Sequence, residues 1–278
     1  MSIDKKGILS APLFDGRGRY LEFQKDEIIF EQILVIPNFT CSLRCKYCAA
    51  GNQYAHRRVF DSKTTVNDFD KLLSVCKTKQ ANIQGGEVFI NPHIDEFFEL
   101  FSQMENINNC ASVALFTNAT AIPSDSALTA YSKIALPKTL MISNYNLPSV
   151  KIDAFVSKIK DYGLDYVVFP EDKYWLNPGD PRQETGFAES ELCEVIKRCT
   201  AFARKPKILE GKFFACGQNA YALYEKLSDY IDIRALAAKK LKEELYDYMV
   251  NRQSYDVCKY CYGQYDNCEK VGVAEQLI

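Results

Sequence analysis

The stretch ILVIPNFTCSLRCKYCAAG, residues 33–51, joins a short apolar run to three closely spaced cysteines. The run Ile33–Ile36 ends at Pro37, and a short apolar run that stops at a turn residue favours a strand buried on both faces. The thiols follow directly, with the spacing C-x3-C-x2-C, at Cys41, Cys45 and Cys48. The stretch therefore predicts a buried parallel strand whose carboxyl end carries three thiols on one loop.

Apolar runs and helical stretches alternate downstream of this strand as far as residue 169. Helices are expected over 66–77, 94–104, 124–131 and 150–162, and strands over 81–84, 112–116, 139–142 and 166–169. Strict alternation of this kind predicts a parallel sheet with right-handed crossovers. The five units are fewer than the eight of a complete barrel, so we expect an α/β fold with a partial TIM barrel of the (β/α)6 type.

The pattern changes at residues 170–186, which are rich in proline, glycine and charge and are expected to form a loop. Beyond this loop we expect helices over 190–203 and 236–250, with a hairpin at Glu210-Gly211. The predicted organisation is an N-terminal extension over 1–32, the partial barrel over 33–186 and a small C-terminal domain over 187–278.

The composition narrows the class of protein. The 278 residues include 34 Lys and Arg against 36 Asp and Glu, and this near balance argues against a nucleic-acid partner, which would normally bring a basic excess. No run approaches the roughly 18 apolar residues of a membrane span, and no apolar signal core opens the sequence, so we expect a cytoplasmic protein with no membrane partner. Eleven cysteines in that reducing setting indicate metal or redox chemistry rather than disulfides.

The three thiols of the first loop can hold three corners of a cubic iron–sulfur cluster, which leaves the fourth iron open to a ligand that is not protein. A structural zinc site would normally need a fourth ligand close by, and His56 is the nearby candidate. A zinc loop and buried free thiols are the alternatives. The loop lies at the carboxyl end of a parallel strand, where barrel folds place their chemistry.

The C-x3-C-x2-C spacing with Tyr47 before the last cysteine resembles the signature of the radical SAM superfamily, and the resemblance covers residues 33–170. It implies a [4Fe–4S] cluster on the three thiols and S-adenosylmethionine (SAM) chelating the open iron. One-electron reduction would then cleave SAM to methionine and a 5′-deoxyadenosyl radical that abstracts a substrate hydrogen. Tyr47 would lie against the adenine.

Further motifs follow in the order that the superfamily implies. Gly85-Gly86-Glu87 ends a strand like its GGE motif: glycines let the backbone approach a cofactor closely, and Glu87 can accept hydrogen bonds from the ammonium of SAM. The ends of the next two strands would present polar side chains to SAM. Those residues are Asn118, Ser143 and Asn144. Ordinary Asx or Ser turns are the alternative for each of them, and Ala119 stands where the family has the glycine of its TNG motif.

A second cysteine group has the spacing C-x16-C-x41-C-x2-C, at Cys199, Cys216, Cys258 and Cys261. It is similar to the twitch domain of some radical SAM enzymes, which implies one auxiliary [4Fe–4S] cluster with four protein ligands. A zinc clamp on the same thiolates is the structural alternative. Cys193, on the same expected helix as Cys199, is a second candidate for the first ligand. Cys268 extends the group with a C-x6-C spacing that is reminiscent of two-cluster extensions.

The twitch-group resemblance implies oxidation of an aminocyclitol or sugar-like alcohol, with the auxiliary cluster accepting the second electron. A flavodoxin- or ferredoxin-type protein would be the electron donor. Segments such as QGGEVFINP and LEGKFFACGQNA also resemble uncharacterised radical SAM proteins associated with surface-polysaccharide pathways. The alternatives are a peptide-modifying maturase, a zinc or iron–sulfur scaffold that is not an enzyme, and an epimerase with a hydrogen donor among Cys193, Cys268 and Cys76.

The expected loop over 170–186 carries candidate substrate contacts. A guanidinium there can orient a hydroxyl-rich or carboxylate ligand through its fixed donors. Solvated loop charges are the alternative for each residue of the set, which is Lys173, Tyr174, Asp180 and Arg182.

Overall fold

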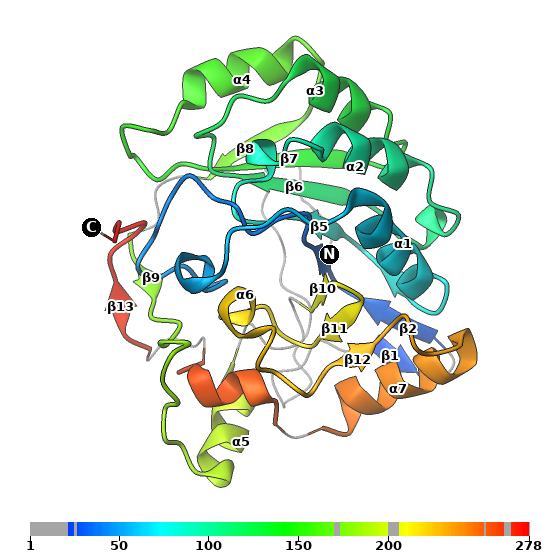
Figure 1. Ribbon diagram of the computed structural model, residues 1–278, viewed down its shortest axis with the longest axis vertical. Coiled ribbons are helices and arrows are strands. Elements are labelled where there is room, and N and C mark those ends of the chain that lie inside the picture. The colour runs from blue at the N-terminus through cyan, green and yellow to red at the C-terminus, as the bar shows by residue number, and fades with distance from the viewer. Residues whose placement is uncertain are drawn as a thin grey trace.

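The computed structural model describes residues 22–24, 27–169, 173–199, 206–252, 254–263 and 268–277. An eight-stranded sheet with the order β12-β11-β10-β3-β5-β6-β7-β8 runs through the molecule (Figure 1). Its strands are β3 (Ile33–Val35), β5 (Ala81–Ile83), β6 (Val113–Thr117), β7 (Lys138–Ser143), β8 (Tyr166–Phe169), β10 (Lys207–Leu209), β11 (Lys212–Phe214) and β12 (Ile231–Asp232). The fold is therefore mixed α/β.

The five strands from β3 to β8 are parallel, as the alternation of elements predicts. The crossover helices line the outer side of this part of the sheet, while α6 (Ala220–Leu223) lies toward its inner side (Figure 1). The crossover helices are α1 (Ser62–Leu73), α2 (Ile94–Ser102), α3 (Asp125–Ser132) and α4 (Ile152–Lys160). Each begins within about a turn of its expected position, so the periodicity located the helices correctly.

The first helix begins four residues earlier than its apolar pattern predicts. The carboxylate of Asp61 accepts a hydrogen bond from the Thr64 backbone N–H at 2.7 Å, which satisfies one of the free donors at the helix N-terminus. The first buried aliphatic of the pattern, Val66, lies one turn further on. The helix therefore starts at its cap, which the apolar spacing does not show.

The strands after residue 206 continue the same sheet. β10 pairs parallel with β3, and β11 and β12 extend it in antiparallel fashion. The expected hairpin is confirmed: Glu210 and Gly211 both have positive φ, 50° and 77°, as a two-residue hairpin turn requires. The sheet thus contains strands from both sides of the expected boundary at residue 186. β10, which follows that boundary in the sequence, is its sixth parallel strand.

The expectation of a loop throughout 170–186 is wrong at Trp175 and Leu176. These two residues form β9 (Trp175–Leu176), which pairs with β13 (Lys270–Val271) in a separate antiparallel sheet. A two-residue strand has no periodicity to detect, and its partner lies more than 90 residues away in the chain. β9 and β13 lie at the edge of the molecule beside the label C (Figure 1).

Smaller elements complete the structure. Helices α5 (Glu189–Arg198) and α7 (Ala238–Val250) match the two helices expected after residue 186, although residues 200–203 of the first expectation lie outside the described part of the chain. β1 (Glu22–Gln24), β2 (Glu27–Phe30) and β4 (Lys77–Thr78) form a three-stranded sheet. The single-turn helices are η1 (Asn52–Tyr54), η2 (Val88–Ile90), η3 (Ile107–Asn109) and η4 (Asp256–Tyr260).

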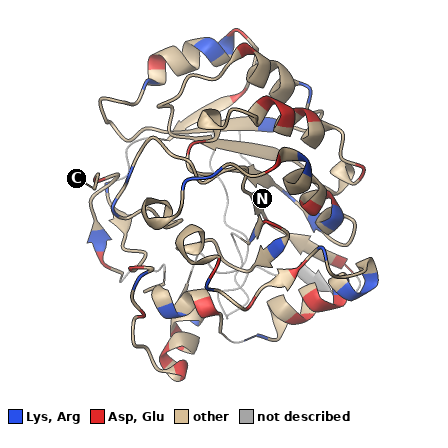
Figure 2. Ribbon diagram, in the orientation of Figure 1, with Lys and Arg blue, Asp and Glu red and all other residues tan. Residues whose placement is uncertain are grey.

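Charge is distributed over the outer helices, and α4 and α7 carry side chains of both signs (Figure 2). The apolar faces of α1–α4 pack on the sheet, with Phe69, Phe97 and Phe155 fully buried. None of the helices in the described ranges has the length and apolar character needed to cross a membrane.

Candidate active site

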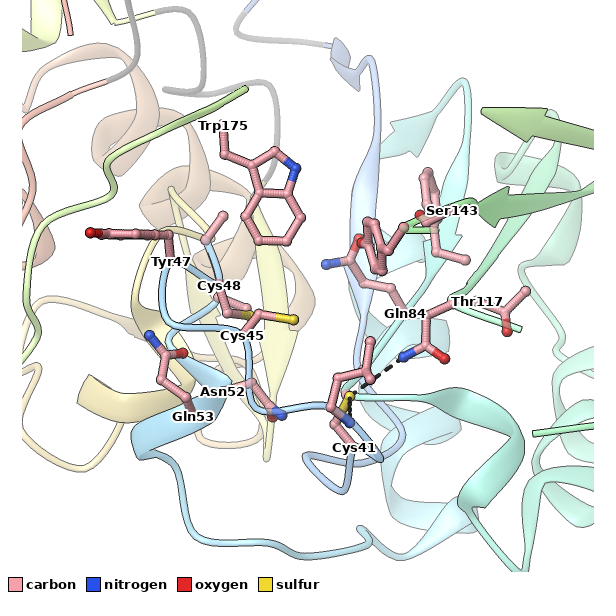
Figure 3. A pocket seen from close by; sticks show the side chains of 18 of the residues that line it. Cys41, Cys45, Tyr47, Cys48, Asn52, Gln53, Gln84, Thr117, Ser143 and Trp175 are labelled. Atoms are coloured by element: carbon pink, nitrogen blue, oxygen red, sulfur yellow. Dashed lines mark hydrogen bonds between the residues drawn. The ribbon is translucent and has the colours of Figure 1, made fainter. Parts of the chain in front are cut away.

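A cavity of about 600 Å³ opens at the carboxyl ends of the parallel strands. The three cysteines of the first loop line it together with residues from the ends of β5, β6, β7 and β8 and from β9 (Figure 3). Three thiols therefore face one space together with the ends of the parallel strands, as the loop's position after β3 predicts.

The thiols of this cavity have N–H donors directed at them. Cys41 Sγ accepts from the Leu43 backbone N–H at 3.4 Å and from Asn118 Nδ2 at 3.6 Å, and Cys45 Sγ accepts from Gln276 Nε2 at 3.2 Å (Figure 3 shows the Cys41 contacts). Such donors stabilise sulfur when it carries negative charge.

Burial acts in the opposite direction on the same thiols. It raises the pKa of Cys41 to about 12 and that of Cys45 to about 11, and it also raises the pKa of Cys48, on which the charge of Lys207 is among the opposing influences. A metal converts a coordinating thiol to the thiolate outright, and binding then releases the protons. Three buried or half-buried thiols, two of them with N–H donors, and an adjoining cavity fit a cubane cluster with one open iron.

The glycines of the second strand end make room for the cysteine loop. A Cβ on Gly86 would overlap the Thr40 carbonyl oxygen, and one on Gly85 would overlap that of Asn38. Two backbone hydrogen bonds run across the same contact, from Gly86 N to Asn38 O at 3.1 Å and from Glu87 N to Thr40 O at 2.8 Å. Both glycines line the cavity, and their physical requirement here is the close approach of the loop backbone.

Glu87 lies behind the cavity wall and does not line the cavity. Its carboxylate is fully buried and accepts hydrogen bonds from Thr117 Oγ1 at 2.8 Å and from the Asn118 backbone N–H at 2.7 Å. Burial raises its pKa to about 7, against the opposing effect of these donors. In this structure Glu87 ties the end of β5 to the end of β6, whereas the sequence predicts a contact to the ammonium of SAM.

The other expected cofactor contacts do line the cavity, namely Tyr47, Asn118, Ser143 and Asn144. Several other residues that line the cavity beside them were not predicted from the sequence. Gln84 and Tyr145 stand at strand ends, so the rule that led to Asn118 and Ser143 also applied to them. Trp175 meets Tyr145 edge to face at 5.4 Å between ring centroids, and no local pattern indicated it. The remaining polar side chains that sequence reasoning missed are Asn52 and Gln53.

Of the four candidate substrate contacts, one lines the cavity and three do not. Tyr174 lines the cavity, whereas Lys173 is exposed and does not. Asp180 and Arg182 form a two-bond ion pair with each other, with Nη2 to Oδ2 at 2.6 Å, and the guanidinium lies 4.3 Å from the centroid of the Tyr54 ring. The pair satisfies its own charges outside the cavity, which matches the alternative of solvated loop charge.

The four thiols of the second group surround a smaller cavity. It is lined by Cys199 directly after α5, Cys216 after β11, Cys258 in η4 and Cys261, with apolar neighbours such as Val257. Burial, and then the neighbouring thiols, raise the pKa of both Cys258 and Cys261. Across the described ranges, no three His, Cys, Asp or Glu side chains converge as they would around a single metal ion.

Four further cysteines have other surroundings. Cys193, half-buried on α5, does not line the second cavity, and Cys268 Sγ donates to Gly263 O at 3.5 Å beside it. Cys76 and Cys110 are buried and donate to the backbone oxygens of Leu72 and Ser112. Cys76 lies outside the cavity of the first loop, so the geometry gives it no position as a hydrogen donor there.

The end of the described chain covers the outer side of the cysteine loop. Lys46 N donates to Glu275 O at 2.7 Å, Leu277 N donates to Arg44 O at 2.8 Å, and Arg44 N donates to the Gln276 side chain at 2.8 Å. No signal in the sequence indicates this contact, because it depends on backbone pairing between residues about 230 positions apart.

Comparison with known proteins identifies the fold. A scan of the sequence against protein-family models gives no match, and a search of curated protein sequences gives none either. Among solved structures, the chain is similar to BtrN in complex with AdoMet and 2-DOIA, with a TM-score of 0.56 and 15% identity over 90% of this chain and 98% of BtrN. It is also similar to anSMEcpe with bound AdoMet, with a TM-score of 0.50 and 12% identity over 87% of this chain and 93% of that one. Both structures were solved with AdoMet bound. The chain therefore shares the fold of two AdoMet-binding proteins, as its resemblance to radical SAM enzymes implies.

Proposed function

We propose that the protein is a radical SAM enzyme that oxidises a hydroxyl group of a sugar- or aminocyclitol-like substrate with the help of an auxiliary [4Fe–4S] cluster. The observation that carries the proposal is the pair of thiol groups, each around a cavity of its own, with three thiols in one and four in the other. In this proposal the sheet is a partial barrel and the C-terminal segment is a twitch-like domain.

Cys41, Cys45 and Cys48 would hold the first cluster, and the wide part of the cavity would hold SAM. Tyr47 offers a ring face to the adenine, and Asn118, Ser143 and Asn144 offer polar groups to its ribose and carboxylate. Bound there, the cluster and SAM supply one-electron chemistry that removes a hydrogen atom from the substrate. The backbone N–H of Leu43 and the amides of Asn118 and Gln276 stabilise the thiolates.

The second site would hold a cluster with four protein ligands, Cys199, Cys216, Cys258 and Cys261. With a protein ligand on each iron, no iron has an open position for substrate, and such a cluster is suited to carrying an electron. Cys199 rather than Cys193 is the first ligand in this proposal, because Cys199 lines the cavity and Cys193 does not.

The lining of the first cavity favours a hydroxyl-bearing substrate. Its described residues present aromatic faces from Tyr145, Tyr174 and Trp175 and amides from Asn52 and Gln53, and they include no Asp, Glu, Lys or Arg. Aromatic faces suit the C–H surface of a saturated ring, and amides can both donate to and accept from hydroxyl groups. The structural neighbour BtrN was solved in complex with AdoMet and 2-DOIA, which supports a small-molecule substrate rather than a peptide.

The test is anaerobic turnover of reconstituted protein with aminocyclitols and nucleotide sugars, followed by mass spectrometry. The protein should bind about eight irons, four per cubane, and form 5′-deoxyadenosine in step with a product that has lost two hydrogens. A product of unchanged mass that carries one deuterium from heavy water would indicate epimerisation instead. Turnover of peptides alone would indicate a maturase. Protein that binds only zinc and leaves SAM intact would overturn the proposal.

A further inference from the structure

Lys207, the first residue of β10, is fully buried. Lysine is among the residues that proteins almost never bury completely, because removing its ammonium from water is costly. A charge in such a position is screened little by solvent and acts strongly on whatever lies around it. The function described above uses no residue of β10, so the location of this charge calls for an explanation.

One side of the ammonium faces the second thiol group. Lys207 Nζ donates a hydrogen bond to Gly217 O at 3.1 Å, and Gly217 directly follows Cys216. The same nitrogen lies 4.2 Å from the centroid of the Tyr221 ring, in a cation–π arrangement. The charge is therefore held against the segment that carries one of the four thiols of the second cavity.

The other side leads to the first thiol group. Tyr221 N donates to Ala50 O at 2.9 Å and Asn219 N donates to Ala49 O at 2.7 Å, so the segment after Cys216 is bonded to the backbone that follows Cys48. A Cβ on Gly51 would lie 3.1 Å from Asn219 Cα, closer than an ordinary contact, which shows how closely the two segments approach. Lys207 thus lies where the two cysteine-bearing segments meet.

We propose that Lys207 tunes the reduction potentials of both clusters. Its buried charge stabilises the reduced form of each cluster and so raises the reduction potential of each. The inference rests on the proposed function and adds a residue that lines neither cavity. The first cluster takes one electron from an external reductant of the flavodoxin or ferredoxin type, and the second takes one from the substrate radical. Each cluster gains one negative charge, with no bond made or broken at Lys207. An ammonium close to both sites favours that added charge.

The experiment is an EPR-monitored redox titration of the reconstituted holoenzyme with Lys207→Gln and Lys207→Met. Glutamine keeps an N–H donor for Gly217 but has no charge, and methionine has neither. Lys226→Gln is the control, because Lys226 is exposed three residues beyond α6. At a fixed potential, the ratio of reduced to oxidised cluster should be about tenfold lower at both sites in the Lys207 variants, equivalent to a shift of about 59 mV for one electron. The control should titrate like the unmodified protein.

The outcomes separate this inference from the proposed function. If unmodified protein assembles no clusters, the proposed function fails before Lys207 is tested. If clusters assemble and SAM is cleaved, but both Lys207 variants titrate within the range of Lys226→Gln, the inference about Lys207 is wrong and the function stands. If Lys207→Met alone shifts the potentials, the hydrogen bond to Gly217 is responsible rather than the charge, and this also overturns the inference.

Discussion

The two thiol groups differ in how the chain brings them together. Cys41, Cys45 and Cys48 lie on one loop after β3, and their cavity of about 600 Å³ extends over the strand ends with aromatic and amide side chains. The second group joins α5, the segment after β11 and η4, and its smaller cavity has mostly apolar neighbours. A three-thiol site with adjoining space can admit a small molecule at the open iron. A four-thiol site enclosed by apolar side chains is suited to electron transfer alone.

The largest effect that distinguishes the two groups is expected from removing thiols. Cys45→Ala leaves the first cluster with two ligands, so SAM cleavage should be lost completely and about half of the roughly eight irons should disappear. Cys258→Ala with Cys261→Ala should remove a similar share of iron but leave SAM cleavage measurable. Iron analysis and quantification of 5′-deoxyadenosine provide the two measurements.

Cys110→Ala is the matched control, because Cys110 is buried but lies outside both cavities. It should keep both the iron and the cleavage activity. The distinction between the sites breaks down if the Cys258 and Cys261 variant retains all its iron, or if it loses SAM cleavage as completely as Cys45→Ala does.

A second, smaller effect is expected from the strand end that supports only the first group. In Gly86→Ala the new Cβ would overlap the Thr40 carbonyl oxygen, so the cysteine loop must shift away from β5. We expect the first cluster to be lost or bound weakly while the second remains, because no described contact of Gly86 reaches the second cavity. Iron analysis with EPR of the remaining cluster would measure this.

Gly272→Ala is the control for that substitution, because a Cβ there would meet Glu275 only at an ordinary contact distance of 3.5 Å. Equal loss of both clusters in Gly86→Ala would show that the glycine supports the whole fold rather than the first site.

The first group was predictable from sequence because its chemistry is local. Three thiols within eight positions, placed after an apolar run, require no knowledge of the fold beyond one strand and one loop. The alternation of strands and helices was readable for the same reason, since each element carries its own period. The ion pair between Asp180 and Arg182 was also predictable from local sequence, because an acid and a base two residues apart in a turn readily pair with each other.

The second group needed topology as well as spacing. Cys193 and Cys199 lie six positions apart on or beside α5, so they cannot occupy one helical face, and only the packing of that helix decides which thiol meets the cavity. Glu87 likewise has a local motif that predicts one partner, yet its burial against β6 gives it Thr117 and Asn118 instead. Long-range pairing decides these cases, and sequence periodicity contains no information about it.

The smallest effect concerns Gln276, which connects the first group to the other end of the chain. Its Nε2 donates to Cys45 Sγ at 3.2 Å and its Oε1 accepts from Arg44 N at 2.8 Å. Gln276→Met removes both of these hydrogen bonds and a third, from Nε2 to Ala274 O at 2.6 Å, while keeping the length of the side chain, at a cost of about 1 kcal/mol for each bond. Donors to sulfur stabilise the cluster-bound thiolate, so a chelator should extract iron from the first cluster several-fold faster, with the second cluster unchanged.

Glu275→Gln provides the comparison for Gln276. It breaks only the exposed ion pair with Lys46, whose Nζ and Oε1 atoms are 3.4 Å apart, and surface pairs of this kind contribute about 0–1 kcal/mol. Its iron should therefore leave at close to the unmodified rate. Equal acceleration by both substitutions would mean that the side-chain bond to sulfur has no specific effect. A general loosening of residues 275–277 over the cysteine loop would then account for the faster loss of iron.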